Sequence, residues 1–413
     1  MIHYNFSKTY SLFFLIHTVF IIPTDLTFVG FLNDSDGIGS FPLVLAEEFK
    51  NKLSMNMYHM RAPILSSFSG LIIDSLGNKK PGTILLFTGL LFELNQQSQK
   101  LLASDSLKIA LSMFESTAIP QSWVATLNNN FDLVCVPDNF LVKVYQDSGV
   151  IIPIFVLPIP LHLSRFYNKK SKKSPSTFVF GMTGDSFPHK NHMLLTQAFI
   201  EEFGKDPAVQ LIIHTKAQIK SPYLIELKDF FGTIDNYHNI VFLEKALSST
   251  EYSDFISFLN CYVLLSMSEG FSITPRQAMA LEIPCILSNN TAHKTLCDSG
   301  FVCSVLSEIE TTPHYLKRLF AKKEFLGFQY TTAILDVRKA LRDVYVRYAY
   351  YQERAKQAKE WVMQYDFSCL KERYLSLLKP EKIILGLENS ITSSAIITNS
   401  PDLYKKYKKK LGI

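Results

Sequence analysis

The chain has 413 residues, of which 47% are hydrophobic and 19% are charged, with a formal net charge of +5. This length is typical of two domains, and the hydrophobic content suffices for two buried cores. The small basic excess comes largely from two short clusters, at residues 169–173 and 405–410. A dedicated nucleic-acid-binding protein spreads positive charge over a whole face, so the composition argues against a nucleic-acid partner.

The six cysteines contain no C-x-x-C pair, and Cys135, Cys261 and Cys285 lie in or beside apolar runs. We therefore expect reduced, buried cysteines and a cytoplasmic protein. Two further cysteines lie near His293, but their spacing fits no common zinc site, so we expect no bound metal.

Near the start, residues 11–23 form an apolar run. A membrane-spanning helix needs about 20 such residues, so this run is too short to span. No small-x-small cleavage site follows it, which argues against a secretory signal. We expect an extra strand or packed helix here. The alternative is peripheral contact with the inner membrane face, to which the lysine cluster at residues 405–410 would contribute by attraction to anionic lipids.

From residue 26 onward, short apolar runs alternate with amphipathic segments, which is typical of a parallel sheet covered by helices. The sequence predicts a strand over residues 26–32, a glycine-rich loop and a helix over residues 42–53. Further strands are predicted over residues 64–68, 83–87, 109–114, 133–136 and 154–156. These elements predict a first domain over residues 1–166. Residues 167–176 are rich in lysine and serine and predict an exposed linker.

The alternation then begins again and predicts a second domain over residues 177–365, followed by a helix and a basic tail over residues 366–413. Ser248 and Glu251 form a capping box at a helix start. Strands are predicted over residues 177–181, 209–215, 240–243, 262–267 and 284–287, and helices over 192–203, 222–231, 252–259 and within 337–378. Two successive Rossmann-like domains predict a binding cleft between them.

Residues 268–281 are the most informative stretch, because the end of the apolar strand over 262–267, a glycine turn at Gly270 and a helix start with Pro275 follow one another there. Proline is tolerated in a first helical turn, where its missing N–H has no partner to lose. A helix N-terminus carries about half a positive charge and unpaired N–H groups, so the amides of residues 271–274 are expected to face a diphosphate. Glu269, just before the turn, can accept hydrogen bonds from sugar hydroxyls.

This stretch resembles the signature Glu-Gly-Phe-Gly-Leu-Pro-x-x-Glu-Ala-Met-Ala of GT-B retaining glycosyltransferases of the family 4, or group 1, type. The resemblance implies that Glu269 contacts the donor sugar and that the second acidic position holds the nucleotide ribose. That position is Gln277 here, and a glutamine binds hydroxyls without charge and more weakly. The remaining implied donor-binding residues of the signature are Phe271, Ser272 and Ile273.

Three other residues resemble functional positions of this family. Lys190, in Phe-Pro-His-Lys-Asn, stands where the family neutralises the donor diphosphate, although His189 and Met182 replace arginines found in many members. Gly39 belongs to a glycine-rich loop expected near the donor phosphate. Glu115, after the strand over residues 109–114, resembles a glutamate that orients the acceptor hydroxyl; capping of the following helix is the alternative role.

The resemblance implies an α/β protein of the GT-B fold, with two Rossmann-like domains facing a cleft and C-terminal helices that return to the first domain. It implies transfer of a sugar, with retention and without a metal or cofactor, from a nucleoside-diphosphate sugar to a hydroxyl of a glycan or lipid-linked glycan. The expected catalytic residues are Glu269, Lys190 and Glu115, and assembly of a surface polysaccharide is the expected setting.

Two alternatives remain open at this point. One is a catalytically inactive GT-B domain that serves as a binding or scaffold protein, which the replacements at Gln277, Met182 and His189 favour. The other is a sugar-nucleotide epimerase on the same fold, although its acid and base residues are not visible in the sequence.

Overall fold

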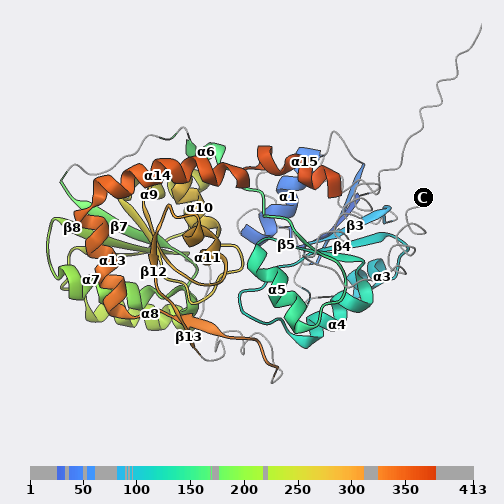
Figure 1. Ribbon diagram of the computed structural model, residues 1–413, viewed down its shortest axis with the longest axis horizontal. Coiled ribbons are helices and arrows are strands. Elements are labelled where there is room, and N and C mark those ends of the chain that lie inside the picture. Colours follow the sequence, from blue (N-terminus) through green and yellow to red (C-terminus); the bar gives the residue numbers. More distant parts are fainter. Residues whose placement is uncertain are drawn as a thin grey trace, which may run out of the picture.

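The computed structural model describes residues 26–32, 37–49, 54–60, 81–88, 91, 94, 96–167, 169, 176–216, 222–310 and 324–377. Four predictions fall on segments that lie wholly or mostly outside these residues: the apolar run at 11–23, the strand over 64–68, the linker and the basic tail. The described chain contains two six-stranded sheets and one two-stranded sheet. Figure 1 shows the two larger sheets side by side, each with its own covering helices.

The first sheet has the strand order β2-β1-β3-β4-β5-β6, and all its paired strands run parallel. Its four central strands are almost entirely buried, as expected for a sheet covered on both faces. One face packs against α3, α4 and α5, and the other packs against α1 and the C-terminal helix α15. The strands are β1 (Leu26–Gly30), β2 (Met55–His59), β3 (Ile84–Phe87), β4 (Leu107–Leu111), β5 (Leu133–Val136) and β6 (Ile154–Val156); the helices are α1 (Gly37–Phe49), α3 (Gln96–Leu102), α4 (Gln121–Asn130), α5 (Asn139–Ser148) and α15 (Phe367–Leu377).

The start of α1 corrects the sequence prediction. We expected a glycine-rich loop through Gly39 and a helix over residues 42–53, whereas α1 begins at Gly37 and ends at Phe49, with Pro42 inside it. Pro42 is the sixth residue of α1, past the first turn, so it does not mark the helix start, and the helix continues through it with one backbone hydrogen bond fewer. Gly39 therefore lies in the first turn of α1 and not in a loop.

The second sheet has the order β12-β11-β10-β7-β8-β9 and is also parallel. The predicted capping box at Ser248 is confirmed, with the Ser248 hydroxyl accepting from the Glu251 amide. The strands are β7 (Phe178–Thr183), β8 (Val209–Thr215), β9 (Ile240–Glu244), β10 (Cys261–Leu264), β11 (Cys285–Ser288) and β12 (Cys303–Val305); the helices are α6 (Ser164–Tyr167), η2 (Pro188–Lys190), α7 (His192–Phe203), α8 (Pro222–Thr233), α9 (Ser249–Phe258), α10 (Ile273–Ala280) and α11 (Thr291–Asp298).

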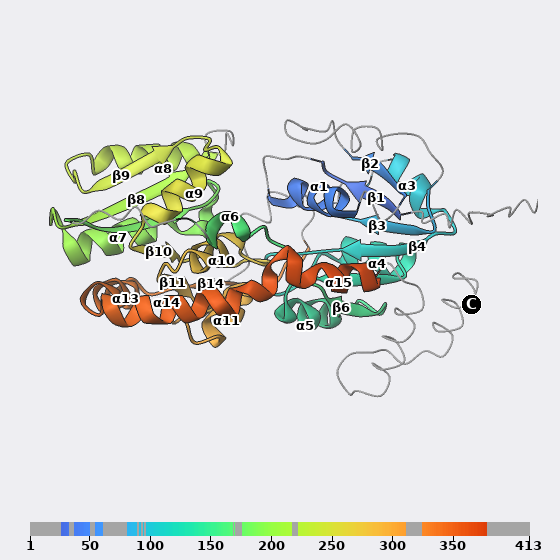
Figure 2. The same ribbon diagram turned by 90° about the horizontal axis from the view of Figure 1, so that it is seen from above.

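The C-terminal helices join the two domains. Helix α13 (Ile334–Val346) packs on α7, where Arg338 and Arg342 both pair with Glu202. Helix α14 (Tyr348–Val362) and η3 (Met363–Tyr365) then lead to α15, whose Phe367 and Tyr374 enter the core of the first domain. Figures 1 and 2 show α14 and α15 running along one edge of the molecule from the second domain to the first. The predicted return of the C-terminal helices is confirmed.

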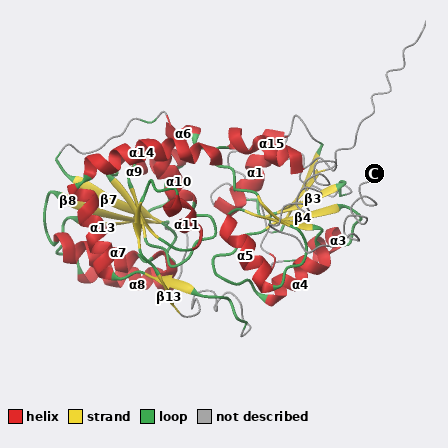
Figure 3. Ribbon diagram, in the orientation of Figure 1, coloured by secondary structure: helices red, strands yellow, loops and turns green. Residues whose placement is uncertain are grey.

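Hydrogen bonds also join the segment before β14 to the first domain. The strands β13 (Glu308–Glu310) and β14 (Gln329–Thr331) form the small antiparallel sheet, which Figure 3 shows at the lower edge of the second domain. Just before β14, the Ser116 hydroxyl donates to the carbonyls of Leu326 and Phe328, and the Phe328 amide donates to Thr117 Oγ1 at 2.7 Å. These bonds hold the segment after β4 against the second domain.

All six cysteines are free, and Cys135, Cys261 and Cys285 are buried, which confirms the prediction made for them. Burial raises the pKa of the Cys135 thiol to about 12, so this thiol stays protonated at neutral pH. In the part of the chain described, no helix combines the length and the apolar character needed to cross a membrane.

Candidate active site

Lys190 and Glu269 form a buried ion pair at the carboxyl-terminal ends of the central strands of the second sheet. Lys190 comes from η2, after β7, and Glu269 from the turn between β10 and α10. The Lys190 Nζ atom lies 2.6 Å from Glu269 Oε1, with the two side chains 15% and 6% exposed. The Ser266 hydroxyl donates to the same carboxylate oxygen at 2.6 Å. Ligands of open α/β sheets bind at this edge, so the pair lies where a site is expected.

Both members of this pair are charged at neutral pH. Burial acts to raise the pKa of the Glu269 carboxyl, but Lys190 and two neighbouring histidines outweigh it and lower the pKa to about 2. Burial acts to lower the pKa of Lys190, and Glu269 and Glu115 reverse that effect and raise it. The site therefore holds a fixed cation beside a fixed anion, shielded from solvent.

Glu115 approaches this pair from the first domain. It follows β4, its side chain is one-third exposed, and its Oε2 atom lies 3.6 Å from His189 Nε2. Burial and the charge of Lys190 hold the pKa of His189 well below its usual value, so the ring is neutral and this contact is not an ion pair at neutral pH. The structure thus brings the three predicted catalytic residues, Glu115, Lys190 and Glu269, together across the domain interface.

Hydrogen bonds between side chains fix the turn before α10. Ser272 has left-handed backbone angles (φ 63°, ψ 79°), and its hydroxyl is 2.8 Å from His293 Nε2. The other ring nitrogen of His293 is 3.1 Å from the hydroxyl of Ser288 at the end of β11. Burial lowers the pKa of His293 to about 4, so a neutral ring links Ser272 to the sheet. The first amides of α10 have no partners within the helix, and this turn sets where they point.

Gly270 lets the turn lie directly against the first domain. A Cβ atom on this residue would come 2.4 Å from the Met113 Cγ atom and 3.4 Å from the Phe114 carbonyl oxygen. A larger residue would therefore require either the Met113 side chain or the turn itself to move.

Gln277 and Met182 occupy positions where the resemblance expects charged groups. Gln277 lies on α10, half-buried, and its Oε1 atom accepts a hydrogen bond of 2.7 Å from the Tyr252 hydroxyl. Met182 is fully buried in the apolar core of the second domain. Of the two positions, only Gln277 presents a polar group beside the turn.

Sequence reasoning missed several residues that build the site. Thr291 accepts from the Glu269 amide at 2.8 Å, and the fully buried Arg276 donates to the carbonyls of Phe271 and Ser272. Arg276 stands at a variable position of the signature, where nothing in the pattern indicates its role. Thr291 and His293 lie about ten residues beyond the end of the signature, and only the parallel order of β10 and β11 brings them to it.

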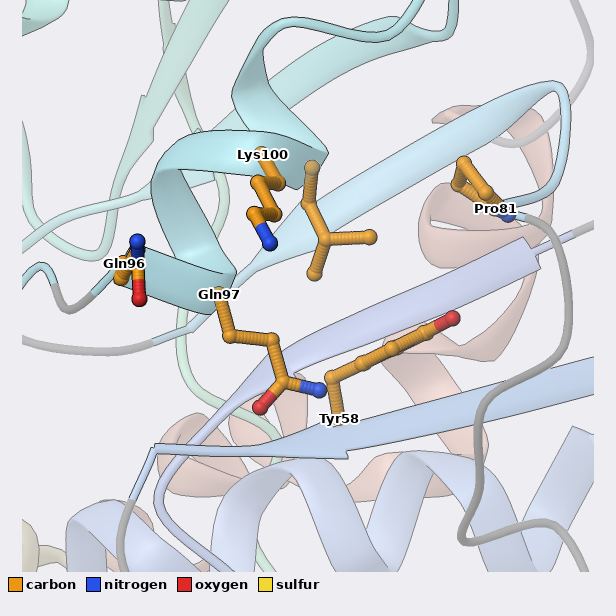
Figure 4. A pocket seen from close by; sticks show the side chains of 6 residues that line it. Tyr58, Pro81, Gln96, Gln97 and Lys100 are labelled. Carbon is orange, nitrogen blue, oxygen red and sulfur yellow. The ribbon is translucent and has the colours of Figure 1, made fainter.

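A separate cavity of about 520 Å³ lies in the first domain, lined by residues of β2 and α3 and by Pro81. Figure 4 shows the side chains of Tyr58, Gln97 and Lys100 directed into this space. Helix α3 lies on the side of the first domain away from the second (Figures 1 and 2), so this cavity is not part of the site around Lys190.

The site lies in a region with a family match. Residues 164–322, which include η2, β10 and α10, match the family model described as glycosyl transferases group 1. The chain carries a group 1 glycosyltransferase domain. This match confirms, for the second domain, the resemblance seen in the signature. No curated protein matches the chain by sequence.

Solved structures of low sequence identity share the fold over nearly their whole length. HepE from Anabaena, in complex with UDP and glucose, has a TM-score of 0.62 at 12% identity, covering 86% of this chain and 99% of its own. Sucrose-phosphate synthase from Thermosynechococcus elongatus has a TM-score of 0.62 at 13% identity, covering 85% and 97%. The UDP-forming trehalose-phosphate synthase from Burkholderia xenovorans has a TM-score of 0.61 at 10% identity, covering 86% and 99%. These likenesses, together with the two parallel sheets, confirm the GT-B fold.

Proposed function

We propose that the protein transfers a sugar from a nucleoside-diphosphate sugar to a hydroxyl of a glycan or lipid-linked glycan, with retention of configuration and without a catalytic metal. The observation that carries the proposal is the buried Lys190–Glu269 pair beside the N-terminus of α10, with Glu115 facing it from the other domain. The group 1 family match supports the reaction class. HepE is described in complex with UDP and with UDP-glucose, so a uridine donor is the first candidate.

The electrostatics of the site suit a leaving diphosphate. Negative charge develops on the diphosphate as the sugar departs, and groups already fixed in place to stabilise such charge usually make the largest catalytic contribution. Lys190 can remain bound to Glu269 and still bind phosphate, because an ammonium has three N–H donors. The helix N-terminus at residues 271–274 adds further donors. In this proposal Lys190 supplies the cation that a metal supplies in other phosphate sites.

Glu269 and Glu115 take complementary roles in the proposal. The Glu269 Oε1 atom is occupied by Lys190 and Ser266, which leaves its second oxygen to accept a hydrogen bond from a hydroxyl of the donor sugar. Glu115 is more exposed and belongs to the first domain, so it is suited to orient the acceptor hydroxyl. No side chain is required as a nucleophile, because the leaving phosphate takes the acceptor proton.

In our proposal, Gln277 binds the ribose as a hydrogen-bond donor, whereas a glutamate at this position would act as an acceptor. Its carbonyl oxygen already accepts from Tyr252, so its amide N–H groups donate to a ribose oxygen. A neutral amide forms weaker hydrogen bonds than a carboxylate. We therefore expect donor binding to depend on Gln277, but only modestly.

The competing function is an inactive GT-B domain that binds or scaffolds. The neutral residues at Met182, His189 and Gln277 favour it, because the site holds less fixed positive charge and one carboxylate fewer than the family pattern. The Lys190–Glu269 pair favours the enzyme, because an ion pair buried at a strand end is costly to keep without a function.

Thermal unfolding with UDP, GDP, ADP, CMP and their common sugar conjugates tests the proposal. A ligand at about 100 times its dissociation constant adds about 2.7 kcal/mol, which raises the midpoint by several degrees. Stabilisation by one nucleoside diphosphate, followed by release of that diphosphate from its sugar conjugate in the presence of a glycan acceptor, is the expected result. If none of the nucleotides raises the unfolding midpoint, the proposal is contradicted and the scaffold function is supported.

A further inference from the structure

Arg276 is the largest fully buried side chain among the described residues, and its surroundings connect the two domains. Its guanidinium carbon lies 3.9 Å from the ring centre of Phe271 and 4.4 Å from that of Tyr365, so it is sandwiched between the signature turn and η3. One terminal nitrogen donates to the carbonyl oxygens of Phe271 and Ser272. The other lies 3.4 Å from Asp138 Oδ2 in the first domain.

The Asp138 side chain bonds to residues of both domains. Its Oδ1 atom caps α5 by accepting from the Phe140 amide at 3.3 Å, and it also accepts from the hydroxyl of Thr295 on α11 at 2.7 Å. The Asp138 side chain is 2% exposed. The ion pair therefore lies inside the interface and connects the start of α5 to α10 and α11.

This arrangement is poorly explained by stability alone. Burial raises the pKa of Asp138, although Arg276 and the hydrogen bonds from Thr295 and Phe140 act to lower it. The cost of removing the carboxylate from water is therefore larger than the stabilisation that these partners provide. Apolar residues of similar size often serve as well as a buried ion pair or better. A buried pair of this kind is better suited to specify one arrangement of the domains.

Separation of the domains would change the signature turn. If the first domain moved away, Arg276 would lose the carboxylate that the structure records against it and would remain charged inside the second domain. Its other contacts are the carbonyls of Phe271 and Ser272, so the turn would have to adjust to the unpaired guanidinium. Ser272 is held in a left-handed conformation that only a fixed environment maintains.

We propose that Arg276 and Asp138 form an interdomain latch, in which Arg276 is a positioning residue that orients the donor-binding turn only when the domains are closed. This inference rests on the proposed function in one respect, since it assigns the coupling to binding of the nucleotide donor. Coupling of this kind is reciprocal: closure strengthens donor binding, and donor binding favours closure.

Asp138→Asn tests the latch with little change of shape, because asparagine can still cap α5 and accept from Thr295. The control is Asp147→Asn on the same helix, where an exposed carboxylate pairs with Lys143. The measurements are the radius of gyration of the nucleotide-free protein by small-angle X-ray scattering and the affinity for UDP by calorimetry. We expect Asp138→Asn to increase the radius of gyration and to weaken UDP binding about tenfold, within the usual range of coupling between sites. The control should change neither quantity.

The double variant Asp138→Asn with Arg276→Gln separates a positioning role from a structural one. It contains no unpaired buried charge, so its thermal stability should recover relative to Asp138→Asn, while the radius of gyration and the UDP affinity stay shifted. If affinity recovers together with stability, the latch is only structural and the proposal is wrong. If the single variant does not fold, Thr295→Val removes one hydrogen bond from Asp138 and should give a smaller change in the same direction.

The outcomes also separate the latch from the proposed function. An unchanged radius of gyration in Asp138→Asn overturns the latch, whatever happens to UDP binding. An increased radius of gyration in a protein that binds none of the nucleotides tested supports the latch and contradicts the proposed function.

Discussion

The two domains share a six-stranded parallel sheet but differ in how they use buried polar residues. In the first domain such residues mostly bond to the backbone of neighbouring strands, as when Asp132 accepts from the Lys108 amide and Ser106 donates to the Gly82 carbonyl. Around the charged pair of the second domain they bond to one another, as Ser266, Glu269 and Lys190 do, although elsewhere in that domain they also bond to the backbone, as when Asn260 accepts from the Val179 amide. The first pattern holds neighbouring strands together, and the second lies at the site that we propose for the donor. The bonding partner of a buried polar residue therefore indicates whether the residue serves the fold or a site.

The Lys190–Glu269 pair provides the strongest test of this comparison. Lys190→Ala leaves Glu269 buried without its cation, which should destabilise the fold by about 3–5 kcal/mol. Loss of one group that stabilises the leaving diphosphate should also lower kcat about 10²- to 10³-fold. Chemical denaturation and a diphosphate-release assay measure the two effects.

Lys190→Met with Glu269→Gln is the matched control. This double variant carries no unpaired charge, so the stability should largely return while the activity stays low. Recovery of activity in the double variant would contradict a catalytic role for the pair.

Acid should destabilise the second domain through its buried histidines. Burial lowers the pKa of His192 to about 3 and that of His293 to about 4. In the unfolded chain both rings take up a proton near pH 6.5, whereas in the folded protein they stay neutral, so stability falls as the pH drops below 6.5. Each histidine contributes about 1.4 kcal/mol per pH unit, or about 2 kcal/mol between pH 6.5 and pH 5.

Denaturant midpoints measured from pH 7 to pH 5 check this dependence. In His192→Gln, the number of protons taken up on unfolding should fall by one, so stability should depend less steeply on pH. His238→Gln, at an exposed position, is the control and should leave the slope unchanged. A stability that is flat across this range would show that the two rings are not buried neutral groups. Below about pH 4.5, protonation of Glu269 in the unfolded chain adds to the loss, since the pKa of its folded form is about 2.

The sequence predicted the second domain better than the first, for physical reasons. Its strands are continuous apolar runs between clear helix signals, and β8 and α7 have the predicted bounds. In the first domain, β2 was not predicted because the Met55–His59 strand alternates polar and apolar residues only weakly. Lys190, Glu269 and Glu115 were predicted from motifs that follow strands, whereas Arg276 and Asp138 meet only because the domains pack together. Local patterns carry no information about that contact.

Glu115 should affect the acceptor and not the donor, since it is the one predicted catalytic residue that belongs to the first domain. Glu115→Gln removes a charged acceptor of hydrogen bonds, a loss of about 1.5–3 kcal/mol, and should lower kcat/KM for the acceptor about 10- to 100-fold. UDP affinity, measured by calorimetry, should stay unchanged. An equal loss of UDP affinity would place Glu115 in the donor site and remove the distinction between the two sides of the interface.

Gln277 should give the smallest effect and separates the enzyme from the scaffold. Gln277→Ala removes one neutral hydrogen bond to the ribose, worth about 1 kcal/mol, and should weaken UDP binding about fivefold. Gln277→Glu should strengthen it, because a carboxylate can accept from the Tyr252 hydroxyl and from a ribose hydroxyl together. Tyr252→Phe is the control, since it frees the Gln277 oxygen without removing the side chain. Opposite effects of alanine and glutamate at this position are expected only if a nucleotide binds beside α10, and identical UDP titrations for all three variants would favour the scaffold.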